Sequence, residues 1–395
     1  MIFYLWKNRT QMKKILLFAA ICFIAQTSVA LQQKQLNAKK FKKFVNNELN
    51  KLYDSEKDFG GATIGIVLPD GKGQSFAIGI ADVANKTPMK PKDRMLGGST
   101  GKVFLSAAIM QLVEKNNIAL DQKVSHYLGH NAWFNRIQNH NTITIRNLMQ
   151  HASGISRYVY EKQFQIDIHK DADRKWTPQE LLSYVFDLKP LFEAGSQFAY
   201  SDTNYIILAM VLEKVTQTSM YDYIYKNVTK PFKLKSITPQ TSRTIKGLVN
   251  GYNAKNDPLF PGDVIENGKY KYNVQFEWAG GGFVMNPVDL AKAGKLVYEG
   301  KMFSKELLPE FFKGIDAKRL GGTWGLGVHM RKTPMGMSYG HSGFFPGYLT
   351  NMLYFPEEKF SIAFQVNTTN QKNISLYRKM FKLIASVKKY ISASK

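Results

Sequence analysis

Ser99 and Lys102 are spaced as the parts of an activated hydroxyl nucleophile. They stand in Gly97-Gly98-Ser99-Thr100-Gly101-Lys102, directly before a run from Val103 to Val113 that is apolar nearly all round and predicts a buried helix. A serine at a helix start has an unpaired backbone N–H near the positive end of the helix dipole, and a lysine three residues on returns to the same face. A lysine whose pKa is lowered by burial or a cationic neighbour could take the serine proton, so that the serine attacks a carbonyl carbon.

The S-x-x-K spacing by itself does not determine a function. An N-cap serine followed by a surface lysine gives the same letters. Residues 97–101 also spell G-x-S-x-G, the elbow of α/β-hydrolases, which needs a strand immediately before the serine. The preceding stretch from Thr87 to Arg94 is polar and holds two prolines, so we expect no core strand there.

No metal or cofactor is expected from the sequence. His126 and His130 are four residues apart, but no glutamate accompanies them, so they do not form a convincing metal pair. The hydrolytic chemistry suggested by Ser99 and Lys102 needs no cofactor.

Four further segments place the serine–lysine pair in a wider pattern. They are Leu148-Met-Gln-His151-Ala-Ser153-Gly154-Ile155, Tyr200-Ser201-Asp202-Thr203-Asn204-Tyr205, Trp278-Ala-Gly-Gly-Gly282 and His341-Ser342-Gly343. Together with Ser99-Thr-Gly-Lys102 they resemble, in order, conserved segments of the serine β-lactamase-like group, which includes class C β-lactamases, D-Ala-D-Ala peptidases and related esterases. The resemblance covers the chain from about residue 60 to about residue 370.

The resemblance implies a role for each matched residue. Ser99 would attack the carbonyl carbon, Lys102 and Tyr200 would move its proton, and Tyr200 would protonate the leaving group. The backbone N–H groups of Ser99 and Phe344 would form the oxyanion hole, one at a helix start and one on an edge strand. The remaining motif residues would contact the substrate: Asp202, Asn204, His341, Ser342 and Gly343. Of these, His341 and Ser342 would line the opposite wall and could meet a substrate carboxylate, whereas His151 is expected to be structural.

Asp202 departs from the pattern of the family, which usually has an asparagine there. An ionised carboxylate at this position would stabilise the protonated form of Lys102 and remove a hydrogen-bond donor. Three alternatives follow: Asp202 is neutral, Tyr200 carries more of the proton transfer, or Asp202 turns away and Asn204 substitutes for it. A non-catalytic binding descendant of the family is the rival hypothesis, and Asp202 is its best support.

The elements expected to position these residues are two hairpins and two terminal helices. Apolar spacing predicts a helix within residues 36–56, strands at 62–68 and 74–83, strands at 348–355 and 360–367, and a helix from about 374 to 387. The predicted fold class is α/β of the α+β type, with an antiparallel sheet built from both chain ends and flanked by the terminal helices.

One catalytic domain is expected over residues 31–395. Its sheet part would comprise residues 31–98 and 290–395, and residues 99–289 would form an inserted, mostly helical part. A cleft between the two parts is the natural place for the site.

The first thirty residues are predicted to be a signal peptide. Lys13 and Lys14 precede an apolar run over residues 15–25, and Ser28-Val29-Ala30 has small residues at positions −3 and −1 of a cleavage site. A periplasmic or secreted protein starting near residue 31 is therefore expected, with an uncleaved anchor as the alternative. Cys22, the single cysteine of the sequence, lies in this segment, so the cleaved chain would have neither disulfide nor cysteine-based metal site.

The net charge of +24 favours anionic surroundings such as wall polymers or lipid head groups. The lysines are scattered along the sequence and no nucleic-acid motif is present, so nucleic acid is not an expected partner. We interpret the charge as a solvated basic surface.

The expected substrate is a peptide, ester or β-lactam. His341 in place of a lysine resembles the peptidase and esterase branches more than the class C β-lactamases. With export, this favours a D-Ala-D-Ala carboxypeptidase-type enzyme acting near peptidoglycan. An esterase or amidase is the next candidate and a true β-lactamase the third.

Overall fold

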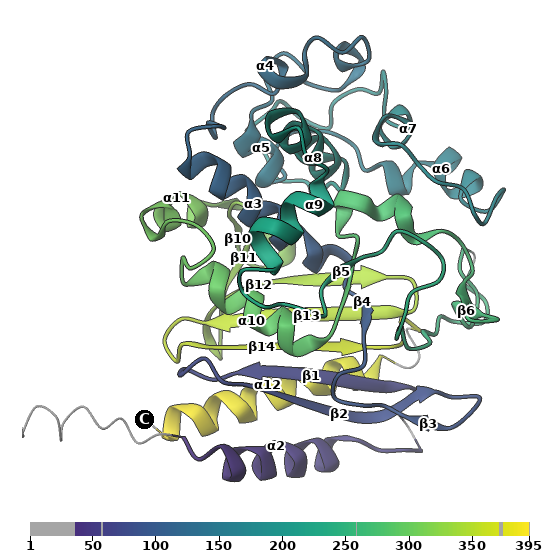
Figure 1. The fold of residues 1–395 in the computed structure, drawn as a ribbon, viewed down its shortest axis with the longest axis vertical. Helices are drawn as coiled ribbons and strands as arrows, with labels where there is room; N and C mark the ends of the chain where they lie inside the picture. Colours follow the sequence, from purple (N-terminus) through teal and green to yellow (C-terminus); the bar gives the residue numbers. More distant parts are fainter. Residues whose placement is uncertain (1–35, 57, 258, 371–373, 395) are drawn as a thin grey trace, which may run out of the picture.

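An antiparallel nine-stranded sheet runs through the centre of the protein (Figure 1). The computed structural model describes residues 36–56, 58–257, 259–370 and 374–394, so the predicted signal peptide lies outside the described residues. The strand order is β3-β2-β1-β14-β13-β12-β11-β10-β9. In that order the strands are Thr87–Pro88, Gly73–Asp82, Gly61–Val67, Phe360–Val366, Tyr348–Phe355, Gly336–Phe345, His329–Thr333, Thr323–Trp324 and Ile315–Asp316.

The two ends of the chain meet in the middle of this sheet. Strand β1 pairs with β2 on one side and with β14 on the other, with Ala62 opposite Val366 and Val67 opposite Ser361. All seven residues of β1 and all seven of β14 are buried, because both faces of the sheet are covered here. The sheet predicted from two hairpins at the chain ends is therefore confirmed.

The terminal helices cover one face of the sheet. Helix α2 (Ala38–Leu52) buries Phe41, Val45 and Leu49, and helix α12 (Ser375–Ala393) buries an apolar stripe along its length. Helix α12 packs on β1 and β14, α2 packs on β2 and on α12, and their buried residues belong to one hydrophobic core. Helix α10 (Pro287–Tyr298) covers the other face, where Pro287 packs so closely on Gly65 that no side chain would fit at that glycine.

The middle of the chain forms the helical region above the sheet in Figure 1. Its helices are α3 (Lys102–Glu114), α4 (Ser125–Leu128), α5 (Ile145–Met149), α6 (Lys162–Asp167), α7 (Pro178–Ser183), α8 (Thr203–Thr216) and α9 (Met220–Ile224), and α11 (Leu308–Phe312) follows later in the chain. The segments of 3₁₀ or π type are η1 (Gly98–Gly101), η2 (Phe134–Arg136), η3 (Tyr158–Tyr160), η4 (Tyr225–Thr229), η5 (Val274–Gly280), η6 (Lys305–Leu307) and η7 (Lys318–Leu320).

Two small sheets accompany the helices. Strands β4 (Met95–Leu96), β8 (Phe283–Met285) and β5 (Thr238–Pro239) form one, and β6 (Ile265–Glu266) with β7 (Lys269–Tyr270) forms the other. The expected division of the chain at residues 289 and 290 falls inside the first turn of α10, which packs on the sheet.

Over the part of the chain that the structure describes, helix length and hydropathy identify no segment able to span a bilayer.

Candidate active site

Ser99 lies in η1, the turn that leads directly into the buried helix α3. Gly98 in this turn has a φ of 51°, and a Cβ there would lie 2.5 Å from the carbonyl oxygen of Phe344 on β12. Only glycine combines this backbone conformation with so close an approach. Gly98 therefore allows the turn that carries Ser99 to lie directly against β12.

Lys102 is fully buried and lies beside the Ser99 hydroxyl. Its Nζ is 3.2 Å from Ser99 Oγ and 2.6 Å from Asp202 Oδ1, and it also donates to the carbonyl oxygen of Gly280. Burial alone would lower the pKa of Lys102, but Asp202 and Tyr200 together outweigh burial and hold that pKa above its ordinary value. The lysine is therefore an ammonium group at neutral pH.

Asp202 forms ion pairs with two cations, Lys102 and Arg157. Its Oδ1 accepts from Lys102, and its Oδ2 accepts from Nη2 and Nε of Arg157 at 2.6 and 3.0 Å. Burial works to raise the pKa of Asp202, but Lys102 and then Arg157 bring it well below its usual range. Asp202 is thus ionised and faces Lys102. Two of the alternatives for this position, a neutral Asp202 and an Asp202 turned away from Lys102, are therefore wrong.

Arg157 was not identified from the sequence. It lies three residues after Gly154, and this proximity to a motif was its only signal. Besides holding Asp202, it donates from Nη1 to the Tyr160 hydroxyl at 2.7 Å, and its guanidinium lies 5.1 Å from the ring centre of Tyr200. Only folding brings it to the site, because 45 residues separate it from Asp202.

Tyr200 lies against Lys102, with 5.1 Å between Nζ and the ring centre. Its hydroxyl is buried, and the side chains of Ser99 and Lys102 are its polar neighbours. Burial raises the pKa of this hydroxyl; Lys102 and Ser99 are close enough to oppose that effect, but they do not cancel it. Tyr200 therefore keeps its proton at neutral pH.

Asn204 lies behind the Tyr200 segment and does not contact Lys102. It is fully buried, its Oδ1 accepts from the Ser153 hydroxyl at 2.6 Å, and its Nδ2 is 3.3 Å from His151 Nδ1. His151 Nδ1 also accepts from the backbone N–H of Ser201 and the imidazole packs on the Tyr200 ring at 4.1 Å. Asn204 and His151 therefore hold the segment that carries Tyr200 and Asp202, and the alternative in which Asn204 substitutes for Asp202 is wrong.

Strand β12 carries the remaining predicted residues. We expected an edge strand here, but β12 lies between β13 and β11 in the sheet. However, β11 pairs only as far as Gly340, opposite His329, which leaves residues 341–345 with one open edge. Gly343 packs on the Gly97 carbonyl, and the Phe344 side chain is 60% exposed. The open half of β12 thus lies beside the turn that carries Ser99, which is the arrangement that the expected oxyanion hole needs.

His341 points inward from this strand, whereas Ser342 is exposed. Its Nδ1 lies 2.6 Å from the Ser342 carbonyl oxygen, so Nδ1 carries the proton and Nε2 is left as an acceptor. Burial, with the charge of Lys102, lowers the pKa of His341 to about 3. The imidazole is therefore neutral and offers no positive charge to a substrate carboxylate.

Trp324 packs against the rings of this site and was also not identified from the sequence. Its ring centre lies 5.1 Å from that of His341, 5.4 Å from Tyr200 and 5.3 Å from His151. His329 stacks on its other side at 5.3 Å. The Nε atoms of Trp324 and of all three histidines are buried without a hydrogen bond to another described residue.

The segment from Glu277 to Gly282 lies against the turn that carries Ser99. Trp278 has φ 36° and ψ −111°, a strained conformation for a residue with a side chain, and the turn aims the Gly280 carbonyl at Lys102. Burial raises the pKa of Glu277 to about 8, and its Oε2 accepts from Gln240 at 2.8 Å. Glu277 is thus a mainly protonated carboxyl group beside the site.

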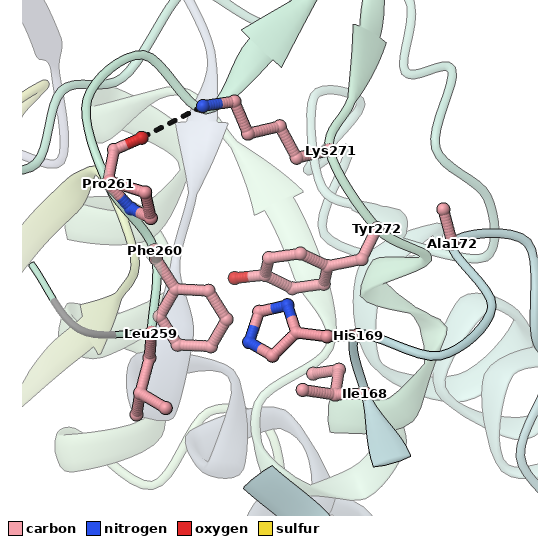
Figure 2. Close-up of a pocket in the computed structure, with 8 residues that line it drawn as sticks. All are labelled: Ile168, His169, Ala172, Leu259, Phe260, Pro261, Lys271 and Tyr272. Carbon is pink, nitrogen blue, oxygen red and sulfur yellow. Dashed lines mark hydrogen bonds between the residues drawn. The ribbon is translucent and has the colours of Figure 1, made fainter. Parts of the chain in front are cut away.

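Two cavities lie elsewhere on the protein. One of about 140 Å³ is lined by the rings of His169, Phe260 and Tyr272, with Lys271 directed to the Pro261 carbonyl at its rim (Figure 2). The other, a groove of about 530 Å³, runs along α9 and η4. None of the predicted catalytic residues lines either cavity.

Comparisons with known proteins identify similar sequences and similar folds. A family model described as Beta-lactamase matches residues 41–385. PbpX of Bacillus subtilis, named for penicillin binding, is 22% identical over 91% of this chain and 85% of its own length. A teichoic acid D-alanine hydrolase of Staphylococcus aureus is 23% identical over 76% of this chain and 69% of its own. Among solved structures, the D-amino acid amidase of Ochrobactrum anthropi SV3 superposes with a TM-score of 0.74 at 20% identity, covering 89% of this chain and 99% of that one.

Proposed function

The chain belongs to the beta-lactamase family of serine hydrolases, and we propose that Ser99 is its nucleophile and forms an acyl-enzyme with D-aminoacyl amides or esters. The observation that carries this proposal is the contact of 3.2 Å between Lys102 Nζ and Ser99 Oγ at the start of a buried helix, with Tyr200 against the same lysine.

The proton path follows from the charge states. Lys102 already carries its proton, so it stabilises negative charge and does not act as a free base. As Ser99 Oγ attacks the carbonyl carbon, its proton passes to the Tyr200 oxygen while the proton of that hydroxyl passes to the leaving group. The backbone N–H groups of Ser99 and Phe344 stabilise the oxyanion. Water then hydrolyses the ester bond of the acyl-enzyme: the proton of the water passes to the Tyr200 oxygen, and the proton of Tyr200 returns to Ser99 Oγ.

The choice of substrate depends on His341. A D-Ala-D-Ala carboxypeptidase must bind a terminal carboxylate, but His341 is neutral and Lys102 and Arg157 are both engaged by Asp202. This favours amides and esters that lack that carboxylate. Two of the relatives are named for hydrolysis of D-amino acid amides and of D-alanine on teichoic acid, which supports a D-aminoacyl group. The carboxypeptidase is the second candidate, supported by the exposed Ser342 hydroxyl on the open half of β12.

Turnover of four substrates, measured side by side, tests the proposal. They are D-alanine amide, a D-alanyl ester, a D-Ala-D-Ala peptide and nitrocefin. We expect the amide or the ester to be hydrolysed fastest. Fastest release of D-alanine from the peptide would make the carboxypeptidase the correct function. Absence of turnover together with absence of covalent labelling by a serine probe would identify a non-catalytic binding protein.

Export of the protein is a separate proposal and rests on the sequence over residues 13–30. N-terminal sequencing of protein from the envelope or the medium should find a chain that starts near Leu31. A chain that retains Met12 in the membrane fraction would contradict cleavage.

A further inference from the structure

The outer layer formed by helices α2 and α12 concentrates positive charge. The 15 residues of α2 and the 19 of α12 together hold ten basic residues and a single acidic one, Glu48. The whole sequence has 54 basic residues against 30 acidic ones, so this layer departs strongly from the average. Lysines that are far apart in the sequence gather here because the two chain ends pack side by side on the sheet (Figure 1).

Most of these cations are free of ion pairs. Three are neutralised: Lys51 by Glu48, Lys379 by Asp58 and Lys388 by Glu358. The other seven are exposed and form no ion pair with another described residue, namely Lys39, Lys40, Lys42, Lys43, Arg378, Lys382 and Lys389. These like charges repel one another. Binding to a polyanionic surface would supply counter-charges and reduce that repulsion.

The arrangement on α12 suits a flat partner. Arg378, Lys382 and Lys389 follow one another at helical spacing, on the side of the helix opposite its buried stripe. Between the two helices the rings of Phe44 and Tyr390 stack at 4.3 Å and are only half-buried. Exposed cations flanking partly exposed aromatic rings are the composition of a helix that lies in a membrane interface.

We propose that the α2–α12 layer docks on an anionic lipid surface. The partly exposed rings of Phe44 and Tyr390 among these cations support a bilayer over a soluble polymer, because aromatic rings can enter a membrane interface. The same helices face away from α4, α5 and α7, which lie at the opposite end of the molecule in Figure 1. A docked molecule therefore presents its helical region away from the bilayer.

Vesicle co-sedimentation of the full chain tests this docking. Phosphatidylcholine vesicles are compared with vesicles that contain about one-third phosphatidylglycerol, at about 50 mM and about 500 mM NaCl. We expect at least tenfold tighter binding to the anionic vesicles at low salt, and loss of that preference at high salt. Any binding by the apolar residues 15–25 is common to both kinds of vesicle, so the ratio between them isolates the charge effect.

Two variants and a matched control locate the effect. Replacing Arg378, Lys382 and Lys389 by glutamine, or Lys39, Lys40, Lys42 and Lys43 by glutamine, should each lower the binding to anionic vesicles at least about tenfold. The control replaces Lys230, Lys233 and Lys235, which are exposed along the 530 Å³ groove, and should change binding less than about twofold. Unchanged melting temperature and unchanged covalent labelling of Ser99 would show that each variant is folded.

Three results would overturn the proposal. They are equal binding to both kinds of vesicle, an equal loss in the control variant, and binding to soluble polyglutamate without any preference for anionic vesicles. The last result would assign the layer to a polyanionic polymer. All three are independent of hydrolytic activity, so they leave the function proposed for Ser99 untouched.

Discussion

Lys102 and Asp202 form a buried ion pair, with 2.6 Å between Nζ and Oδ1, directly beside the Ser99 hydroxyl. Arg157 binds the other carboxylate oxygen, so two cations share one anion in the site. This arrangement holds Lys102 as an ammonium group, and in the mechanism that we propose Tyr200 therefore moves the protons. The following predictions depend on it.

Ser99→Ala should abolish covalent labelling by a fluorescent penicillin or a fluorophosphonate. It should also lower turnover by at least about a thousandfold, or roughly 4 kcal/mol of barrier, because the acyl-enzyme cannot form. Ser106→Ala is the control, since Ser106 is buried on α3, the helix that follows Ser99, and its hydroxyl contacts Tyr205. Labelling that persists in Ser99→Ala would remove Ser99 from its role.

Asp202→Asn should shift the alkaline inflection of the pH–rate profile to lower pH. The carboxylate raises the pKa of Lys102 against the effect of burial, so without it that pKa falls and the ammonium group is lost earlier as the pH rises. Labelling by penicillin at neutral pH should be retained, whereas the free energy of unfolding should drop by about 3–5 kcal/mol because Arg157 loses its counter-charge. An inflection that does not move would mean that Asp202 is only structural.

Arg157→Gln should shift the acidic inflection of the same profile to higher pH. Arg157 is the second of the two charges that lower the pKa of Asp202, so its removal lets the carboxylate take up a proton at a higher pH. Arg157→Lys should restore part of the shift. The matched control is Arg136→Gln, because Arg136 forms a mostly exposed ion pair with Asp187 and not with Asp202. If Arg157→Gln and Arg157→Lys both gave the wild-type pH–rate profile, Arg157 would have no role in the reaction.

Glu277→Gln should stabilise the protein at alkaline pH. The folded-state pKa of Glu277 is raised from 4.5 to about 8 by burial, so the stability that the neutral carboxyl contributes is complete below about 4.5 and is lost as the pH rises to about 8. The variant keeps the contact with Gln240 and cannot ionise. Its advantage in urea unfolding should therefore grow from about pH 5 to 8 and then level off. A constant difference across this range would show that Glu277 titrates normally.

The sequence by itself determined the parts that depend on local periodicity. The spacing of Ser99 and Lys102 brings both side chains to one side of a helix start, because residues three apart face the same way. The alternation and turn residues of the two hairpins predicted strands that the structure has within about one residue at each end. The order of the motifs along the chain was enough to indicate the family.

Charge states and partners were decided only by the tertiary structure. Lys102 and Asp202 are 100 residues apart, and the pKa of each depends on burial and on charges that other segments supply. No local pattern could therefore show that Arg157 completes the ion cluster or that Asn204 lies behind it. The tautomer of His341 likewise follows from one backbone hydrogen bond. Lysines that look scattered in the sequence form one surface because α2 and α12 pack on the same sheet. The electrostatic energy between two charges depends on their separation in space, which the sequence does not show.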